Sequence, residues 1–80
     1  MQKLGELLRK KRLAAGFTQM NVAKKAGLSS AQFISNVERG IAGPPLSMLG
    51  MMIRLYRINP EEAVKIIIDI SKVKLRKHLF

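Results

Sequence analysis

The sequence predicts a compact all-α domain of five helices, of which the last is extended. Apolar residues recur at three- and four-residue spacing in five segments, and stretches containing glycine or proline separate these segments. Eighty residues form one domain, close to the lower size limit for a self-sufficient core. Because the chain contains no cysteine, neither disulfides nor thiolate metal sites support that core, and helix packing must supply it.

The charge balance indicates a polyanionic partner. Lysine and arginine number 15 against 5 acidic residues, which gives a net charge of +10. Nucleic acid is the first candidate and an anionic membrane surface the second. The N-terminus is charged and lacks the apolar segment of a signal peptide, and no apolar run is long enough to span a membrane. We therefore expect no membrane partner and a location in the cytoplasm, at the nucleoid. With one tyrosine and three phenylalanines, the chain lacks the aromatic platforms of single-strand and RNA binders.

The first two predicted helices are joined by a glycine turn. Residues 1–15 carry one apolar stripe and are followed by Gly16, the usual residue after a helix C-terminus. Thr18 suits the N-cap of a short second helix over residues 19–26. Asn21 stands where a capping box has its acid, so the acidic partner of such a box is missing. The stripe of the first helix consists of Leu4, Leu7, Leu8 and Ala15.

The third predicted helix, residues 31–39, has two clearly different faces. Ser29 or Ser30 would cap it, and Gly40 would end it. Its apolar side consists of Phe33, Ile34 and Val37, and its opposite side consists of Gln32, Ser35, Asn36 and Arg39. A solvated face usually carries lysine and glutamate, whereas amides and hydroxyls both donate and accept, as base edges in the major groove require. Gln32 also suits a capping box with Ser29, and the two roles are compatible.

A fourth helix follows a loop. Two prolines exclude regular structure at residues 41–45. Residues 46–56 then form a helix that is apolar nearly all round, which predicts burial on more than one side. Gly50 within it is expected to mark a close contact with another helix. The main stripe consists of Leu46, Leu49, Ile53 and Tyr56.

Asn59, Pro60 and Glu62 predict the start of the fifth helix, as N-cap, first-turn proline and capping-box acid. This helix is expected to continue to about residue 77. One apolar stripe would pack on the core of the domain: Ala63, Ile66, Ile67, Ile70 and Val73. A second, separate stripe needs another cover, and a helix of a partner chain is the expected one: Val64, Ile68, Leu75 and Leu79.

Several pieces of the chain together resemble the lambda-repressor-like helix-turn-helix family, the Cro and phage-repressor type of bacterial regulator. The resemblance covers roughly residues 4–58. It is carried by Lys11-Arg12, Phe17-Thr18-Gln19, Val22-Ala23, Ala26-Gly27-Leu28-Ser29, residues 33–40 and Pro45-Leu46. It implies a compact five-helix DNA-binding domain whose third helix reads the major groove.

The resemblance also implies roles for individual positions. Base-reading positions are matched by Ala31, Gln32 and Asn36, with Ser35 between them. Gln19 matches a glutamine that lies against a phosphate and supports the recognition helix. Arg12 and Glu38 match a pair that bridges the first and third helices. The predicted set of residues that contact phosphate or position helices is Gln19, Lys11, Arg12, Lys24, Ser30 and Arg39.

The main functional hypothesis is a sequence-specific, double-stranded DNA-binding transcriptional regulator that acts as a homodimer on a palindromic operator. Residues 1–58 would bind DNA, and residues 59–80 would pack on this domain and dimerise. One alternative is the DNA-binding antitoxin of a toxin–antitoxin pair, with a toxin covering the fifth helix. Another is a sequence-tolerant nucleoid protein. No enzyme, cofactor or metal site is expected, because His78 is the sole histidine and no nucleophile–base pair or metal-binding set can be assembled.

Overall fold

The computed structural model describes residues 2–68. Within this range the chain forms helices joined by turns and loops, and no β-strand occurs. Helix α1 spans Gln2–Ala14, α2 Gln19–Lys25, α3 Gln32–Glu38 and α4 Leu46–Leu55. A further helix covers residues 60–68 and is called helix 60–68 below. The prediction of an all-α fold with five helices is confirmed. The predicted extension of the last helix beyond residue 68 lies outside the described residues.

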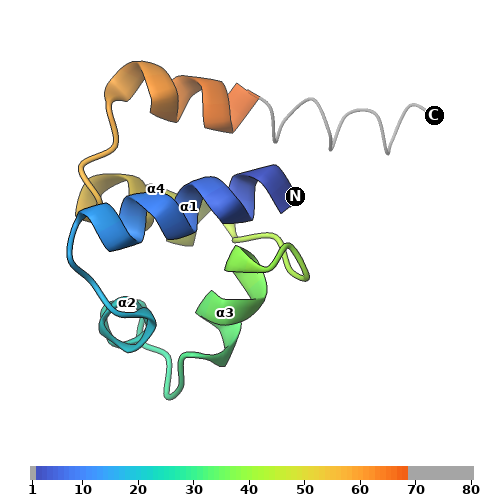
Figure 1. Ribbon diagram of the computed structural model, residues 1–80, viewed down its shortest axis with the longest axis vertical. Coiled ribbons are helices and arrows are strands. Elements are labelled where there is room, and N and C mark those ends of the chain that lie inside the picture. Colours follow the sequence, from blue (N-terminus) through green and yellow to red (C-terminus); the bar gives the residue numbers. More distant parts are fainter. Residues whose placement is uncertain (1, 69–80) are drawn as a thin grey trace.

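Helix α1 lies in the middle of the molecule (Figure 1). On one side of it are α2 and α3, which contact each other, and α3 also contacts α1. Helix 60–68 lies on the other side of α1, where Glu62 pairs with Lys11. The α2–α3 pair and helix 60–68 therefore occupy opposite ends of the molecule, with α1 between them.

The core draws on every helix. Its largest side chains, which are almost wholly buried, are Leu8, Val22, Ile34, Val37, Leu49 and Met52. Tyr56, Ile58, Ala63 and Ile66 extend the same cluster towards helix 60–68. Burying such side chains contributes roughly 1.5–3 kcal/mol each before the entropy of ordering them is subtracted. The predicted apolar sides of the first and third helices supply this core, since Leu8, Ile34 and Val37 are buried and Leu4, Leu7 and Phe33 pack against them.

Two predicted helix starts differ from the structure. Asn21 completes a capping box with Thr18 although it is not acidic: the Thr18 N–H donates to Asn21 Oδ1 at 2.9 Å, and the Asn21 N–H donates to Thr18 Oγ1 at 3.0 Å. The amide oxygen accepts as a carboxylate would. At α3 neither serine is the N-cap. That position is Ala31, whose backbone is already helical and makes no side-chain cap bond, whereas a capping side chain bonds from an extended backbone.

The predicted capping box between Ser29 and Gln32 is also not formed. The Gln32 N–H donates to Ser30 Oγ at 3.4 Å, while the Gln32 side chain donates to Asn36. The box at residue 59 is incomplete in a similar way. Asn59 Oδ1 accepts from the Glu61 N–H at 2.8 Å, but the Glu62 side chain turns to Lys11 instead. In each case the side chain expected to reach back has a partner elsewhere.

The close helix contact expected at Gly50 lies instead at Gly5. A Cβ added to Gly50 would meet only the end of the Arg54 side chain, at 3.4 Å. At Gly5 in α1 an added Cβ would lie 2.5 Å from the Val37 carbonyl oxygen and 2.6 Å from that of Glu38. The absence of a side chain at Gly5 therefore lets α1 approach the C-terminal end of α3.

Three apolar residues predicted to face the core are exposed: Ala15, Leu46 and Ile67. Ala15 lies just beyond the last residue of α1, and Leu46 lies in the first turn of α4, 63% exposed. The buried stripe of helix 60–68 is narrow and includes Ala63 and Ile66. Ile67 lies at the edge of this stripe and is exposed. The predicted core positions Ile70 and Val73 lie outside the described residues.

Candidate nucleic-acid interface

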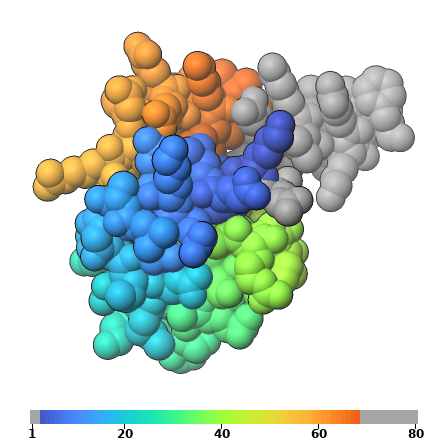
Figure 2. Space-filling model, in the orientation of Figure 1, coloured from blue at the N-terminus to red at the C-terminus, as the bar shows by residue number. Residues whose placement is uncertain are grey.

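The outer face of α3 carries the polar side chains that the sequence predicted for it. Gln32 and Arg39 are exposed, and Ser35 and Asn36 are partly exposed. The apolar side of the helix is buried, so this polar face cannot rotate inward without exposing that side. Ala31, the remaining predicted base-reading residue, is the N-cap position and is partly exposed. In the space-filling view α2 and α3 form one continuous surface at the end of the molecule away from helix 60–68 (Figure 2).

Gln32 and Asn36 are joined on this face by a hydrogen bond. Gln32 Nε2 donates to Asn36 Oδ1 at 3.0 Å. The bond leaves the Gln32 carbonyl oxygen free to accept and the Asn36 amide nitrogen free to donate. One acceptor and one donor are thus held on neighbouring turns of the helix. An adenine offers the matching pair in the major groove, an acceptor at N7 and a donor at N6.

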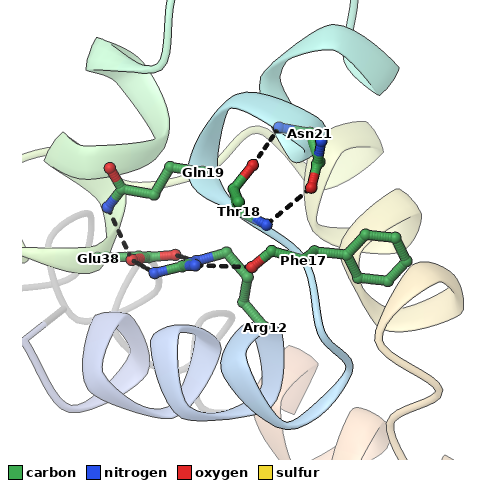
Figure 3. A network of polar contacts seen from close by, with 6 residues as sticks. All are labelled: Arg12, Phe17, Thr18, Gln19, Asn21 and Glu38. Carbon is green, nitrogen blue, oxygen red and sulfur yellow. Dashed lines mark hydrogen bonds and ion pairs between the residues drawn. The ribbon is translucent and has the colours of Figure 1, made fainter.

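An ion pair between Arg12 and Glu38 fixes the far end of α3 to α1 (Figure 3). Arg12 Nε donates to Glu38 Oε2 at 2.6 Å, and Arg12 Nη2 donates to Glu38 Oε1 at 3.1 Å. Both side chains are almost fully buried. The two parallel bonds form the bidentate geometry that favours arginine over lysine. The structure thus brings the two residues together as the resemblance implied.

Two further hydrogen bonds connect this ion pair to α2. Arg12 Nη1 donates to the Phe17 carbonyl oxygen at 2.8 Å, and Gln19 Nε2 donates to Glu38 Oε1 at 3.0 Å. In Figure 3 the Gln19 side chain reaches Glu38 from α2, and the Arg12 side chain reaches it from α1. One buried carboxylate therefore joins three helices. An amide nitrogen has two protons, so this bond leaves Gln19 one proton with which to contact a phosphate.

Tyr56, at the end of α4, lies next to the same network. Burial, and to a lesser extent the nearby Glu38 carboxylate, raise the pKa of Tyr56 to about 12, although the positive charge of Arg12 opposes the increase. Its hydroxyl oxygen is buried and has no hydrogen-bond partner among the described residues. Its ring centroid lies 6.3 Å from that of Phe17, with 37° between the ring planes. Tyr56 is therefore an apolar support for the network, held in its neutral form.

Besides Gln19, the predicted phosphate-contacting residues differ in where the structure places them. Lys24 in α2 and Ser30 and Arg39 at the two ends of α3 are exposed on the α2–α3 surface. Arg12 is buried in its pair with Glu38, so it positions helices and is not accessible to a phosphate. Lys11 points to the other side of α1, where its Nζ lies 3.0 Å from Glu62 Oε2. The charge of Lys11 is therefore paired with that of helix 60–68, and its contact with phosphate stays a prediction.

The predicted dimerisation residues lie on an exposed face of helix 60–68. Val64 is 54% exposed and Ile68 is 45% exposed, and Ile67 beside them is 41% exposed. Leu75 and Leu79 lie outside the described residues. Three large apolar side chains exposed within two turns of one helix are unusual for a surface that faces only water.

Several of these contacts were not predicted from the sequence. The Gln32–Asn36 bond has a signal in the sequence, since the residues are four apart and so share a helix face. The Lys11–Glu62 pair and the closeness of Tyr56 to Glu38 have none, because the partners are far apart in sequence and only the packing of helices brings them together. No group of three or more metal-ligating side chains occurs among residues 2–68. None of the helices in this part is long and apolar enough to cross a membrane.

Comparison with known proteins gives one finding. The family model described as "Helix-turn-helix domain" matches residues 3–65, which include α1 apart from its first residue, the whole of α2, α3 and α4, and the start of helix 60–68. Searches of curated proteins and of solved structures give no match.

Proposed function

Since the chain belongs to the helix-turn-helix domain family, as the resemblance to lambda-repressor-like proteins predicted, we propose that it is a sequence-specific, double-stranded DNA-binding transcriptional regulator. The observation that carries this proposal is the outer face of α3. It combines exposed amide, hydroxyl and guanidinium groups with a buried apolar side, and the Arg12–Glu38–Gln19 network holds it rigidly against α1 and α2. Rigid placement favours reading by hydrogen bonds, since geometry decides which base is accepted.

Helix α3 would enter the major groove with Gln32, Ser35 and Asn36 towards the bases. The joined amides of Gln32 and Asn36 suit an adenine, and Arg39 suits a guanine or a phosphate. Gln19, Lys24 and Ser30 would contact the DNA backbone on either side. The net charge of +10 supports an affinity that falls steeply with salt concentration.

The regulator would act as a homodimer on a palindromic operator. The exposed apolar face of Val64 and Ile68 supports this, because association would remove it from water. A single domain of this size reads only a few base pairs. Two domains related by twofold symmetry would read two half-sites separated by about 34 Å, one turn of the duplex.

Selection of binding sequences from a random duplex pool tests the readout. We expect the wild-type protein to enrich one sequence and Gln32→Ala to lose the preference at one or two base pairs in each half-site. Lys24→Ala is the matched control, since Lys24 is exposed on α2 and its side chain makes no hydrogen bond or ion pair within residues 2–68. It should weaken all sequences about equally and leave the preferred sequence unchanged. A flat preference of the wild-type protein would contradict specific binding and favour a sequence-tolerant nucleoid protein.

Light scattering at several concentrations tests the dimer. We expect twice the monomer mass for the wild-type protein and a shift towards monomer for Ile68→Lys. Leu46→Lys introduces the same charge at an equally apolar, exposed position on α4 and should leave the mass unchanged. A monomer at every concentration would contradict self-association. Co-purification with a small protein would then favour the antitoxin alternative.

A further inference from the structure

Each of the helices α1 to α4 is followed by a residue in the left-handed backbone conformation, and one of these residues is not glycine. Gly16, Gly27 and Gly40 have φ values of 82°, 75° and 77°, and Arg57 after α4 has a φ of 53°. The turn at Arg57 is closed by hydrogen bonds from the Arg57 N–H to the Arg54 carbonyl and from the Ile58 N–H to the Ile53 carbonyl. A side chain is strained in this conformation, and glycine is not. The side chain of Arg57 therefore destabilises the turn in which this residue lies.

No contact within the described residues explains why an arginine stands there. Arg57 is exposed, and its guanidinium makes no hydrogen bond or ion pair with any residue of the range 2–68. A residue that strains the backbone without a compensating contact is expected where function requires the side chain. The guanidinium, and not the turn, is then what retains arginine at this position.

Arg57 borders a cleft of about 690 Å³ between the C-terminal ends of α1 and α4. Arg54 and Lys11 supply two more cations to its lining, and no acidic residue contributes to it. Lys11 is paired with Glu62, which lies outside this lining, whereas Arg54 is exposed and makes no ion pair within the described part of the chain. Arg54 and Arg57, which are three residues apart in the sequence, thus both line an open cleft whose charged groups are all positive.

The cleft adjoins the start of α2. Phe17 lies in its wall and directly precedes Thr18, the N-cap of α2, which belongs to the α2–α3 surface. A duplex that contacts this surface continues for several base pairs beyond those that α3 reads. Its phosphate backbone carries one negative charge per roughly 1.7 Å of axis. The positively charged cleft would therefore attract the part of the backbone that lies next to it.

We propose that Arg54 and Arg57 bind a phosphate group in this cleft, supplied by the DNA backbone next to the base pairs that α3 reads. The inference rests on the proposed function and extends the DNA contact to the end of α4. Arginine is well suited to this task, because its planar donors bond two phosphate oxygens at once. The energy lost to the strained turn is then offset by this contact in the complex.

The variant Arg57→Gly separates the strain from the binding. We expect its melting temperature without DNA to be higher than that of the wild-type protein by about 4–8 °C, since glycine removes the strain. We also expect weaker binding to a mixed-sequence duplex of about 30 base pairs. Losing one phosphate contact should make the slope of log affinity against log salt concentration shallower by about 0.9. Between 1 M and 0.1 M salt the affinity of the variant should therefore rise roughly eightfold less than that of the wild-type protein.

Two more variants serve as companion and control. Arg54→Gln, within a regular helix, leaves the turn unchanged and should weaken binding to the same duplex by a similar factor. Lys65→Ala removes one positive charge from helix 60–68, at the opposite end of the molecule from the α2–α3 surface, and should change the salt slope by much less. Inorganic phosphate, added at constant ionic strength without DNA, tests a free anion as the source of the phosphate group.

The outcomes separate this inference from the proposed function. Higher thermal stability of Arg57→Gly together with a reduced salt slope supports the phosphate contact. Unchanged DNA binding of Arg57→Gly, or a lower melting temperature, overturns it while leaving the proposed function intact. Stabilisation of the wild-type protein by inorganic phosphate, with unchanged DNA binding of the variant, overturns the assignment to DNA. Absence of any duplex binding by the wild-type protein overturns the proposed function and this inference with it.

Discussion

Two neighbouring residues of α1 form ion pairs whose surroundings differ. The side chains of Arg12 and Glu38 are 7% and 2% exposed, and further hydrogen bonds to Phe17 and Gln19 surround the pair. The side chains of Lys11 and Glu62 are 29% and 46% exposed. Because successive residues point about 100° apart on a helix, Arg12 faces α2 and α3 while Lys11 faces helix 60–68. Helix α1 is thus held firmly against α2 and α3 by a buried ion pair, and only loosely against helix 60–68 by a partly exposed one.

The largest expected effect is on the buried pair. Glu38→Ala leaves the Arg12 charge buried without a counterion and removes the acceptor of Gln19, so the free energy of unfolding should fall by about 3–5 kcal/mol. Urea denaturation measures this. Glu61→Ala is the control, because Glu61 is an exposed glutamate and its loss should change stability by about 0.5 kcal/mol or less. A small effect at Glu38 would mean that the network does not anchor α3.

Raising the pH should lower the free energy of unfolding through the ionisation of Tyr56, which lies next to the same buried pair. Its pKa is about 12 in the folded protein and about 10 in an unfolded chain. The stabilisation from keeping the phenol neutral is therefore complete below pH 10 and is lost as the pH rises towards 12, by about 2–3 kcal/mol. Comparing urea denaturation at pH 9 and at pH 11.5 for wild-type protein and Tyr56→Phe isolates this contribution, since other groups titrate alike in both.

At pH 7 the same substitution has a different expected outcome. The Tyr56 hydroxyl has no partner among the described residues, so Tyr56→Phe should leave stability within about 1 kcal/mol of the wild-type value or raise it. A larger loss at pH 7 would contradict the description of Tyr56 as an apolar support.

A smaller effect is expected where α1 approaches α3. Gly5→Ala would place a Cβ within 2.6 Å of two carbonyl oxygens of α3, and backbone atoms cannot move aside as the end of a side chain can. We expect a loss of about 1–3 kcal/mol in the free energy of unfolding. Gly50→Ala is the matched control, because it meets only the Arg54 side chain and should stabilise α4 by roughly 0.5–1 kcal/mol. Equal effects in the two variants would contradict the close approach.

The smallest effect is expected at the exposed pair. Lys11→Met should lower the free energy of unfolding by about 0.2–1 kcal/mol, because solvent and salt screen the attraction to Glu62. Thermal melts at 0.05 M and 1 M salt measure it, and the difference from the wild-type protein should shrink at high salt. An effect as large as that of Glu38→Ala would remove the contrast between the two sides of α1.

The helices, and most of their inward and outward faces, could be predicted from the order of residues along the chain. The spacing of apolar residues depends only on the helical period, so the buried sides of α1 and α3 followed from it, and Gly16, Gly27 and Gly40 marked the helix ends because the left-handed turn favours glycine. The polar face of α3, which is proposed to contact DNA bases, was predicted from the same helical period. The predictions at Gly50 and Leu46 were wrong, because the packing partners of these residues come from elsewhere in the chain. The N-cap predicted at Ser29 or Ser30 was wrong because the helix begins at Ala31, whose backbone is already helical.

The contacts that join the helices to one another could be seen only in the folded protein. Glu38 collects bonds from Arg12 and Gln19, Lys11 turns to Glu62, and Gly5 admits the carbonyls of α3. Each of these contacts joins residues 19 or more positions apart in sequence. Whether two such residues meet depends on the packing of whole helices, which arises from the sum of many weak apolar contacts. The strained turn at Arg57 belongs to the same class, since its cleft exists only where the ends of α1 and α4 come together.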